Sequence, residues 1–271
     1  MHNAIGRTRT ITDRLDPARA AALHATLGRD GPPPQAGDPL PPFWHYIQFW
    51  EPAPPAALGR DGHPKPGNFI PDTGLPRRMW AGGRLDFLRP ARLGQDAEKT
   101  STIAAIDVKS GRSGDLAIVR IDHEITQDGQ ICIRERQDLV YRADPDPTAT
   151  APTPPTAPGV EAHCRPVTFD TTLLFRYSAL TFNGHRIHYD RDYCKTVEGY
   201  PGLVVHGPLL AQLLIHEAEA FLGGLRSFEF RATAPLFDFE AADLCARPDG
   251  DILSLWVRGP DGRQCMIATA T

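Results

Sequence analysis

The feature of this sequence that most constrains its fold is a proline-rich segment near the middle of the chain, at residues 144–158. Its prolines are interspersed with alanine, threonine and aspartate: Pro145, Pro147, Pro152, Pro154, Pro155 and Pro158. Because proline fixes φ and lacks an amide hydrogen, such a segment forms extended, semi-rigid chain that buries little surface. We therefore predict a linker at residues 144–166, between an N-terminal domain (residues 1–143) and a C-terminal domain (residues 167–271).

The composition is that of a globular chain that can bury a core, since 41% of its 271 residues are hydrophobic and 23% are charged. No apolar run approaches the ~18 to 20 residues of a membrane helix. The net charge of -4 argues against a nucleic-acid binder, which usually carries a basic face. Five cysteines without a CxxC pair indicate neither a disulfide framework nor a zinc site, so reduced thiols are expected. The N-terminal residues lack an apolar signal-peptide core, and we expect a cytoplasmic protein.

The first half opens with a predicted helix. Asp13 or Asp16 can cap it, Pro17 suits its first turn, and Gly28 ends it. An aromatic stretch at residues 43–50 is followed by several prolines, so it predicts at most one short helix.

Three later segments of the first half alternate β-branched and polar residues, as half-buried strands do. They lie at residues 100–108, 116–126 and 130–141, and Asp128 and Gly129 form a strong hairpin-turn signal between the last two. Since tight turns join antiparallel neighbours, we predict an antiparallel sheet.

The second half centres on a long amphipathic helix, predicted at residues 207–222 and stopped by two glycines. Its buried stripe is expected to contain Leu210, Leu214, Ala218 and Phe221, with Leu213 and Leu222 beside them. A strand at residues 168–178 is expected to lead to a loop at 181–189. Four more strands are predicted at residues 225–232, 240–247, 252–258 and 264–269. One helix followed by antiparallel strands indicates an α+β domain whose sheet wraps the helix.

The densest group of polar residues lies at residues 177–190, before this helix. His188 is a candidate acid or base because imidazole titrates near neutral pH, and Asn183 and His185 are close enough to share its pocket. Gly207 begins the long helix, where a backbone amide can point outward and stabilise an oxyanion. A base that faces an oxyanion donor is the arrangement of an active site.

Structural explanations exist for the same residues. His188 and His206 could each be a hydrogen-bonded core histidine, and Gly207 could serve only close packing. Asp190 is suited to capping the next helix. His185 and His188 could bind a metal, but no compact third ligand accompanies them in the sequence, so we predict no metal site.

Residues 177–190 and residues 199–208, which read Gly-Tyr-Pro-Gly-Leu-Val-Val-His-Gly-Pro, resemble the hydratase segment of the MaoC-like enoyl-CoA hydratases and dehydratases. The resemblance is greater to the branch of 3-methylfumaryl-CoA (mesaconyl-type) hydratases and mitochondrial-type 3-hydroxyacyl-thioester dehydratases. The first half resembles the degenerate N-terminal hotdog domain of that branch, most recognisably at residues 78–83. This resemblance implies an α+β double hotdog, with two curved antiparallel sheets each wrapped around a central helix.

The chain departs from the wider family at one catalytic position. That family has an Asp, an Asn two residues later and a His three residues beyond, and these positions hold Asn183, His185 and His188 here. The resemblance therefore implies altered chemistry, in which His188 carries more of the proton transfer and Asn183, with His185, positions water. The Gly207 amide would stabilise the enolate.

The resemblance implies a hydro-lyase that reversibly hydrates a 2-enoyl-CoA thioester, for example the short branched dicarboxylic 3-methylfumaryl-CoA. A (3R)-hydroxyacyl-thioester dehydratase of fatty-acid synthesis and a non-catalytic acyl-CoA-binding hotdog protein are the alternatives. A substrate carboxylate calls for an arginine in the pocket, and His206 is a further substrate-binding candidate. The candidate arginines are Arg77, Arg78, Arg84 and Arg176. We expect no cofactor beyond the CoA of the substrate, no partner other than acyl-CoA, and a monomer or a homodimer.

Overall fold

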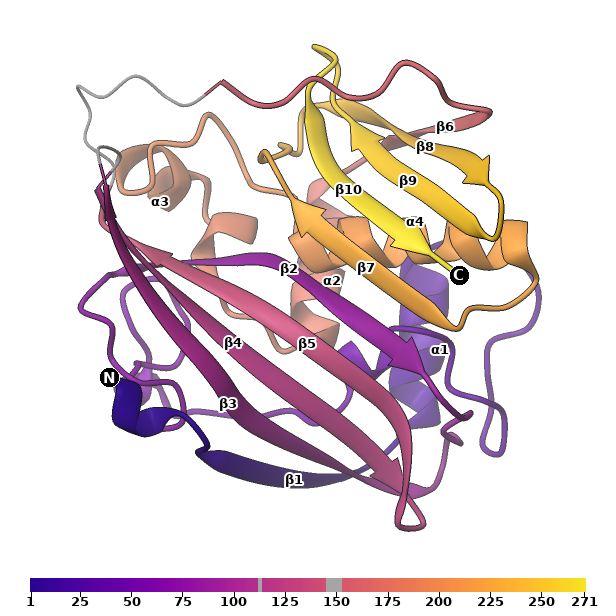
Figure 1. Cartoon of the computed structure of the whole chain (residues 1–271), viewed down its shortest axis with the longest axis horizontal. Coiled ribbons are helices and arrows are strands. Elements are labelled where there is room, and N and C mark those ends of the chain that lie inside the picture. The colour runs from indigo at the N-terminus through magenta and orange to yellow at the C-terminus, as the bar shows by residue number, and fades with distance from the viewer. Residues whose placement is uncertain (112–113, 145–152) are drawn as a thin grey trace.

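The fold was analysed in a computed structural model that describes residues 1–111, 114–144 and 153–271. Ten strands form one antiparallel sheet in the order β1-β3-β4-β5-β2-β7-β10-β9-β8-β6, and the main helices lie on one face of it (Figure 1). The first five strands in this order come from the N-terminal half and the last five from the C-terminal half. No helix in these described ranges is both long and apolar enough to cross a membrane.

The N-terminal half consists of long strands and short helices. Its strands are β1 (Thr8–Arg14), β2 (Arg77–Phe87), β3 (Asp96–Gly111), β4 (Gly114–Gln127) and β5 (Gln130–Arg142). Its helices are α1 (Pro17–Thr26) and the 3-10 helices η1 (His2–Ala4), η2 (Trp44–Ile47) and η3 (Pro55–Ala57). The predicted helix and three strands are confirmed, whereas β1 and β2 were not predicted. Asp16 caps α1 by accepting a hydrogen bond from the Ala18 amide at 2.7 Å, and the predicted hairpin turn has φ values of 52° and 70° at Asp128 and Gly129.

The C-terminal half contains the long helix. Its helices are α2 (Thr171–Leu180), the 3-10 helix η4 (Arg186–His188), α3 (Arg191–Thr196) and α4 (Gly207–Leu222). Its strands are β6 (His163–Thr168), β7 (Ser227–Ala232), β8 (Ala241–Asp249), β9 (Ile252–Arg258) and β10 (Gln264–Ala270). The bounds of α4 agree with the sequence prediction, and Gly223 ends the helix in the left-handed region at φ 70°.

The strand predicted at residues 168–178 was wrong. The strand lies earlier, at β6, and Asp170 begins helix α2 by accepting a hydrogen bond from the Leu173 amide at 2.7 Å. Strand β6 pairs with β8, so the last four residues of the predicted linker, 163–166, belong to the C-terminal half. The prolines within residues 145–152 lie outside the described residues.

The prediction of reduced thiols was also wrong for one pair of cysteines. Cys164 on β6 and Cys245 on β8 are directly opposite each other and form a disulfide, with Cα atoms 4.2 Å apart. Strand register, which the sequence alone does not reveal, brings them together. The other cysteines, Cys132, Cys194 and Cys265, are free and buried.

Helix α4 packs against β7 to β10 and β2, and its apolar stripe forms the centre of the largest core cluster. Leu210, Leu214 and Ala218 are buried as predicted, but Phe221 and Leu222 in the last turn of α4 are 49% and 38% exposed. The same cluster includes residues of α1 and η2. One core therefore spans both halves.

Strands β2 and β7 join the two halves into one sheet. Gly82 and Gly83 of β2 lie at this junction, where a Cβ on Gly83 would be 2.3 Å from the Arg136 carbonyl oxygen and one on Gly82 would be 2.7 Å from that of Phe230. Neither position has room for a side chain, which explains the paired glycines in residues 78–83.

Candidate active site

The polar segment predicted as the site begins in the last turn of α2 and continues into the turn that follows the helix. Phe182 adopts a left-handed conformation (φ 50°), and its ring stacks on Trp50 with centroids 5.1 Å apart. A non-glycine residue in this region is uncommon and is held by its surroundings. The turn directs the next residue, Asn183, so that its Oδ1 accepts a hydrogen bond from the His185 amide at 3.0 Å.

His188 has the features of a general base. It is 6% exposed, and its Nδ1 lies 2.7 Å from the Val204 carbonyl oxygen. Because a carbonyl only accepts, Nδ1 carries the proton and Nε2 has the free lone pair. Burial lowers the pKa of His188 to about 3 although the Val204 bond acts to raise it, so the imidazole is neutral at pH 7.

The ring of His206 packs against the ring of His188. Their rings stack with centroids 3.6 Å apart, and the Nε2 of His206 lies 2.8 Å from the Ser178 hydroxyl. His206 is completely buried, and burial lowers its pKa well below the ordinary value. This placement does not support the predicted substrate contact for His206, because its ring lies against His188 in the interior.

A loop of the N-terminal half interlocks with this segment. The Arg186 amide donates to the Asp61 carbonyl at 2.8 Å. Gly62 has φ 88°, and a Cβ there would lie only 2.0 Å from the Gly184 carbonyl oxygen. The two backbones thus approach as closely as glycine permits.

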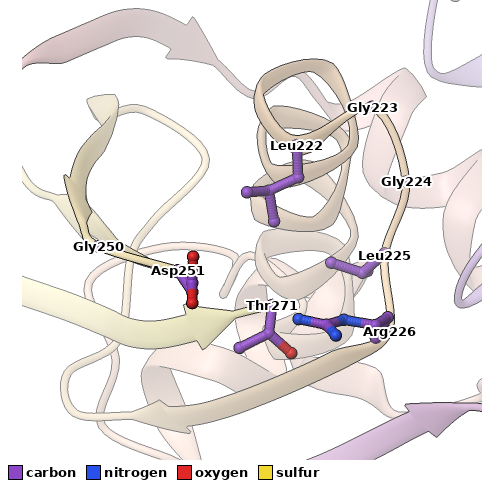
Figure 2. Close-up of a pocket in the computed structure, with 8 residues that line it drawn as sticks. All are labelled: Leu222, Gly223, Gly224, Leu225, Arg226, Gly250, Asp251 and Thr271. Atoms are coloured by element: carbon purple, nitrogen blue, oxygen red, sulfur yellow. The ribbon is translucent and has the colours of Figure 1, made fainter.

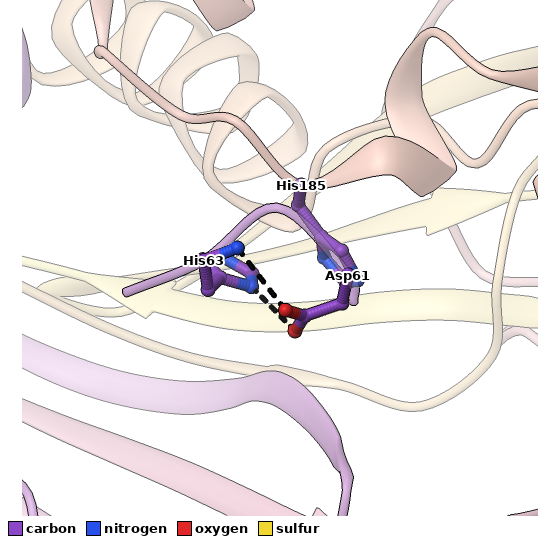
Figure 3. Close-up of side chains that lie close together, drawn as sticks. All are labelled: Asp61, His63 and His185. Atoms are coloured by element: carbon purple, nitrogen blue, oxygen red, sulfur yellow. Dashed lines mark hydrogen bonds and ion pairs between the residues drawn. The ribbon is translucent and has the colours of Figure 1, made fainter. Parts of the chain in front are cut away.

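This loop brings Asp61 and His63 beside His185 (Figure 3). Asp61 Oδ2 accepts from His63 Nδ1 at 2.9 Å, and the rings of His63 and His185 are 4.3 Å apart. Burial and the charge of Arg78 lower the pKa of His63 to about 4, although hydrogen bonds with Asp61 and Asn183 oppose this. Burial also lowers the pKa of His185, further than that of His63.

Sequence reasoning missed Asp61 and His63. It also found no third metal ligand near His185, whereas potential ligand atoms of Asp61, His63 and His185 all lie within 4.8 Å of one another. The signal that could have pointed to this loop was the Asp-Gly-His order itself, because glycine between two polar residues marks a tight turn.

Gly207 is the first residue of α4, as predicted, and it lies against an aromatic ring. A Cβ on Gly207 would be 2.9 Å from Cε3 of Trp80, and Trp80 in turn stacks on Phe230 with centroids 4.3 Å apart. The packing role considered for this glycine is therefore present. The position at the helix start, next to His206, also remains suited to an oxyanion donor.

The structure separates the candidate arginines. Arg77 is bound to Glu198 at 2.6 Å, Arg84 to Asp86 at 2.8 Å, and Arg176 is exposed on α2. Arg78 alone of the four acts on the histidine cluster, because its charge lowers the pKa of both His63 and His185. Its charge also acts on the Asp61 carboxylate and on Tyr141, where burial acts to raise the pKa of each group and the charge of Arg78 acts to lower it.

Two surface hollows lie elsewhere. One is at the C-terminal end of α4 (Figure 2), about 24 Å along the helix from Gly207. Its lining residues are Leu222, Gly223, Gly224, Leu225, Arg226, Gly250, Asp251 and Thr271. The adjacent hollow includes Arg84 and Arg226. Neither contains a histidine, so the predicted role of Arg84 at the site is not supported.

Comparison with known proteins places the chain in a family. The family described as hydroxyacyl-thioester dehydratase type 2 matches residues 43–238, which is more than half of the chain. The chain belongs to this family. The matched range contains both the Asp61 loop and the hydratase segment, and the predicted enzyme class, a hydro-lyase of the MaoC-like hydratase and dehydratase type, is confirmed.

Two curated relatives show the branch. The mesaconyl-C(4)-CoA hydratase of Chloroflexus aurantiacus is 49% identical over 98% of this chain and 95% of its own length. The mitochondrial hydroxyacyl-thioester dehydratase type 2 of Schizosaccharomyces pombe is 29% identical over 80% of each chain. The family branch predicted from the sequence is thereby confirmed.

Solved structures confirm the double hotdog. HtdX from Mycobacterium tuberculosis aligns with a TM-score of 0.69 over 97% of this chain and 99% of its own, at 18% identity. Another protein of that organism, described as a double hotdog, aligns with a TM-score of 0.58 over 98% and 95%, at 16% identity. At these identities the likeness concerns the fold alone.

Proposed function

We propose that this enzyme hydrates the double bond of a short, branched, dicarboxylic 2-enoyl-CoA, of the 3-methylfumaryl (mesaconyl-C4) type. The 49% identity to a mesaconyl-C(4)-CoA hydratase along almost the whole chain supports the reaction. The reaction needs a base for water, a proton for the α-carbon and donors for the enolate oxygen.

His188 is the base in this proposal. Its Nε2 takes a proton from water, the water oxygen bonds to the β-carbon, and the π electrons move to the thioester oxygen as an enolate. The amide of Gly207 stabilises that oxygen, and the imidazolium of His188 then returns the proton to the α-carbon. Asn183 and His185 position the water.

The observation that carries the choice of acyl group is the placement of Arg78. In a 3-methylfumaryl thioester the free carboxylate is attached to the β-carbon, the atom that water attacks. Its counter-ion must therefore lie next to the histidine cluster, which is where the charge of Arg78 acts. A guanidinium pairs well with a carboxylate. A simple long-chain acyl group has no carboxylate that could form an ion pair with a cation at that position.

Ultraviolet absorbance of the conjugated thioester tests this proposal, with 3-methylfumaryl-CoA, crotonyl-CoA and a longer enoyl-CoA compared side by side. We expect the highest kcat/KM with 3-methylfumaryl-CoA. Arg78→Met should raise KM for that substrate by about 10- to 100-fold, the value of a charged hydrogen bond, and leave crotonyl-CoA unaffected. Arg84→Met is the matched control.

Other outcomes would assign another function. Preference for the longer thioester would favour a (3R)-hydroxyacyl-thioester dehydratase, the activity named for the Schizosaccharomyces pombe relative. Binding of every thioester without turnover would indicate an acyl-CoA-binding protein.

The proposal also covers cofactors, location, partners and oligomeric state. Hydration of an activated double bond requires neither a redox cofactor nor a metal, and the CoA belongs to the substrate. We propose a cytoplasmic enzyme whose partner is the acyl-CoA alone, and which acts as a monomer or a homodimer. Its N-terminal hotdog, residues 1–143, completes the site formed by the C-terminal hotdog.

A further inference from the structure

A completely buried histidine lies against the candidate base. The ring of His206 stacks on that of His188, with centroids 3.6 Å apart and ring planes at 19° to each other. Burial lowers the pKa of His206 well below its ordinary value, and the charge of His188 acts in the same direction. A proton that His188 accepts therefore stays on His188, and His206 remains neutral beside it.

The segment that carries His206 also holds the edge of the His188 ring. The Val204 amide donates to the Ile187 carbonyl at 2.9 Å, which joins this segment to the one that carries His188. The Val204 carbonyl in turn accepts from Nδ1 of His188 at 2.7 Å. Val204 thus fixes one edge of the ring, and His206, two residues later, covers its face.

Ser178 of α2 holds the ring of His206. Its hydroxyl lies 2.8 Å from Nε2 of His206. Nδ1 of His206 is buried without a partner, so this is the one hydrogen bond of the ring within the part of the chain that the structure describes. The Ser178 carbonyl accepts from the Asn183 amide at 2.8 Å. One residue of α2 therefore contacts both His206 and the turn that carries Asn183.

The stacked ring limits how His188 can move. A ring held at a single atom can turn about that hydrogen bond, so the Val204 bond alone leaves the direction of Nε2 undetermined. A second ring packed on its face removes this freedom and keeps solvent from that face. Burial is the main cause that lowers the pKa of His188 to about 3, and the cover that His206 provides is part of that burial.

We propose that His206 is a positioning residue for the general base of the hydration reaction, and that Ser178 holds His206 in place. This inference rests on the proposed function. His206 fixes the direction in which Nε2 of His188 meets the reacting water, and it exchanges no proton with the substrate.

Ser178→Ala tests the positioning role, because it removes the hydrogen bond and leaves both rings in place. With purified full-length protein and 3-methylfumaryl-CoA, we expect kcat to fall about 10-fold at unchanged KM, since a misplacement of about 1 Å can cost roughly 100-fold. Ser101→Ala is the matched control. Ser101 is also a buried serine whose hydroxyl lies 2.7 Å from a histidine nitrogen, Nδ1 of His123 in the N-terminal half. That variant should keep its kcat.

His206→Ala uncovers the face of His188, and the pH profile of kcat/KM reports the change. Hydration should raise the pKa of His188, because burial is the main cause that lowers it. The acid limb, where His188 becomes protonated and inactive, should then move to higher pH. His206→Phe restores a ring on that face, so its limb should lie closer to that of the wild type. His63 and His185, the other titratable groups that act on His188 or face it, are the same in both variants.

The outcomes separate this inference from the function on which it rests. If the wild type hydrates the thioester, normal kcat in Ser178→Ala overturns the role of Ser178. An unmoved acid limb in folded His206→Ala likewise overturns the role of His206, and in both cases the proposed function stands. A merely structural role would lower Tm and leave the limb in place. NMR titration of His188 in protein with isotope-labelled histidine needs no substrate and should show the same order of pKa values. If the wild type hydrates no enoyl-CoA, the function and the catalytic role of His206 both fail. Should His206→Ala not fold, His206→Asn, which also lacks the ring, gives the same readout.

Discussion

The two hotdog halves of this molecule differ in what they bury under the sheet. In the C-terminal half the sheet covers α4, a 16-residue helix whose buried residues are mostly apolar, with Gln212 and His216 as the polar exceptions. In the N-terminal half the longest helix is α1, with 10 residues, and η1, η2 and η3 are single turns. The strands there are much longer, up to 16 residues in β3.

The space between η2 and β5 is filled by hydrogen-bonded polar side chains. Glu135 Oε2 lies 3.0 Å from Nε2 of His45, and its Oε1 accepts from the Tyr46 hydroxyl at 2.6 Å. Gln137 and Trp80 donate to the same hydroxyl. Burial acts to raise the pKa of Glu135, but the hydrogen bond and charge of His45 lower it to about 2. The comparison teaches that one half buries a charged, hydrogen-bonded network, whereas the other buries a mostly apolar helix that begins at Gly207, beside the candidate site.

The largest expected effect tests the network of the N-terminal half. Glu135→Ala leaves His45 and Tyr46 without their buried partner, and should lower the free energy of unfolding by about 3–5 kcal/mol. Because the folded-state pKa lies below the ordinary value, the contribution of Glu135 is present above about pH 4.5 and is lost as the pH falls towards 2. Urea unfolding at pH 7 and pH 3 measures both effects. Glu124→Ala, at an exposed pair with Arg134, is the control, and equal stability of the two variants would contradict a role for the network.

The next effect tests the catalytic half. His188→Ala should lower kcat by at least about 100-fold while the fold survives. His216→Gln is the control, because His216 is a buried histidine of α4 that bonds Gln212 outside the site. Thioester absorbance and Tm are measured on the same preparations. A folded His188→Ala protein with normal turnover would show that His188 is not the base. The assignment of the base to the C-terminal half would then be wrong.

Gly207 tests the contact between the halves. Gly207→Val should cost about 1–3 kcal/mol of stability, the usual cost of overpacking, because Trp80 of β2 occupies the space. Turnover should fall as well if the amide serves the enolate. Gly224→Val, in open space at the other end of the helix, should change neither. Tm and kcat are measured on the same preparations, and a lower Tm with kcat preserved in the folded protein would mean that the glycine serves packing alone.

The smallest expected effect concerns Asn183. Asn183→Ala should lower kcat roughly 10-fold, the value of one hydrogen bond of about 1.4 kcal/mol. Asn183→Asp restores the residue of the wider family and should retain more activity with a changed pH profile. The pH dependence of kcat for both variants checks this. Identical rates for wild type and Asn183→Ala would show that Asn183 only shapes the turn.

Local signals explain which parts of the fold were predictable. The helix at α4 has a glycine start, an apolar stripe and a glycine stop, and each acts within a few residues. At α2 the β-branched and aromatic residues favoured a strand, but the Asp170 cap and the burial of Leu174 and Tyr177 on one face favoured a helix. Capping outweighed propensity at that position.

The parts of the site that the sequence concealed depend on contacts between distant segments. Asn183, His185 and His188 are neighbours in the chain and could be proposed together. Asp61 and His63 reach them only because two loops meet at Gly62 and Gly184. The pairing of Cys164 with Cys245 depends on strand register in the same way.

The pairing of β2 with β7 has a consequence for how the sequence of such a site can evolve. In an assembly of identical subunits every substitution is present in each copy, and the assembly separates on dilution. Here the halves share one chain and one sheet, so a loop of one half can acquire new polar residues while its counterpart keeps its own sequence. Each chain carries one N-terminal half and one C-terminal half, so the two halves that meet at the histidines are present in equal number at any protein concentration. Two halves fused in one chain can therefore differ in sequence at the site, whereas two identical subunits cannot.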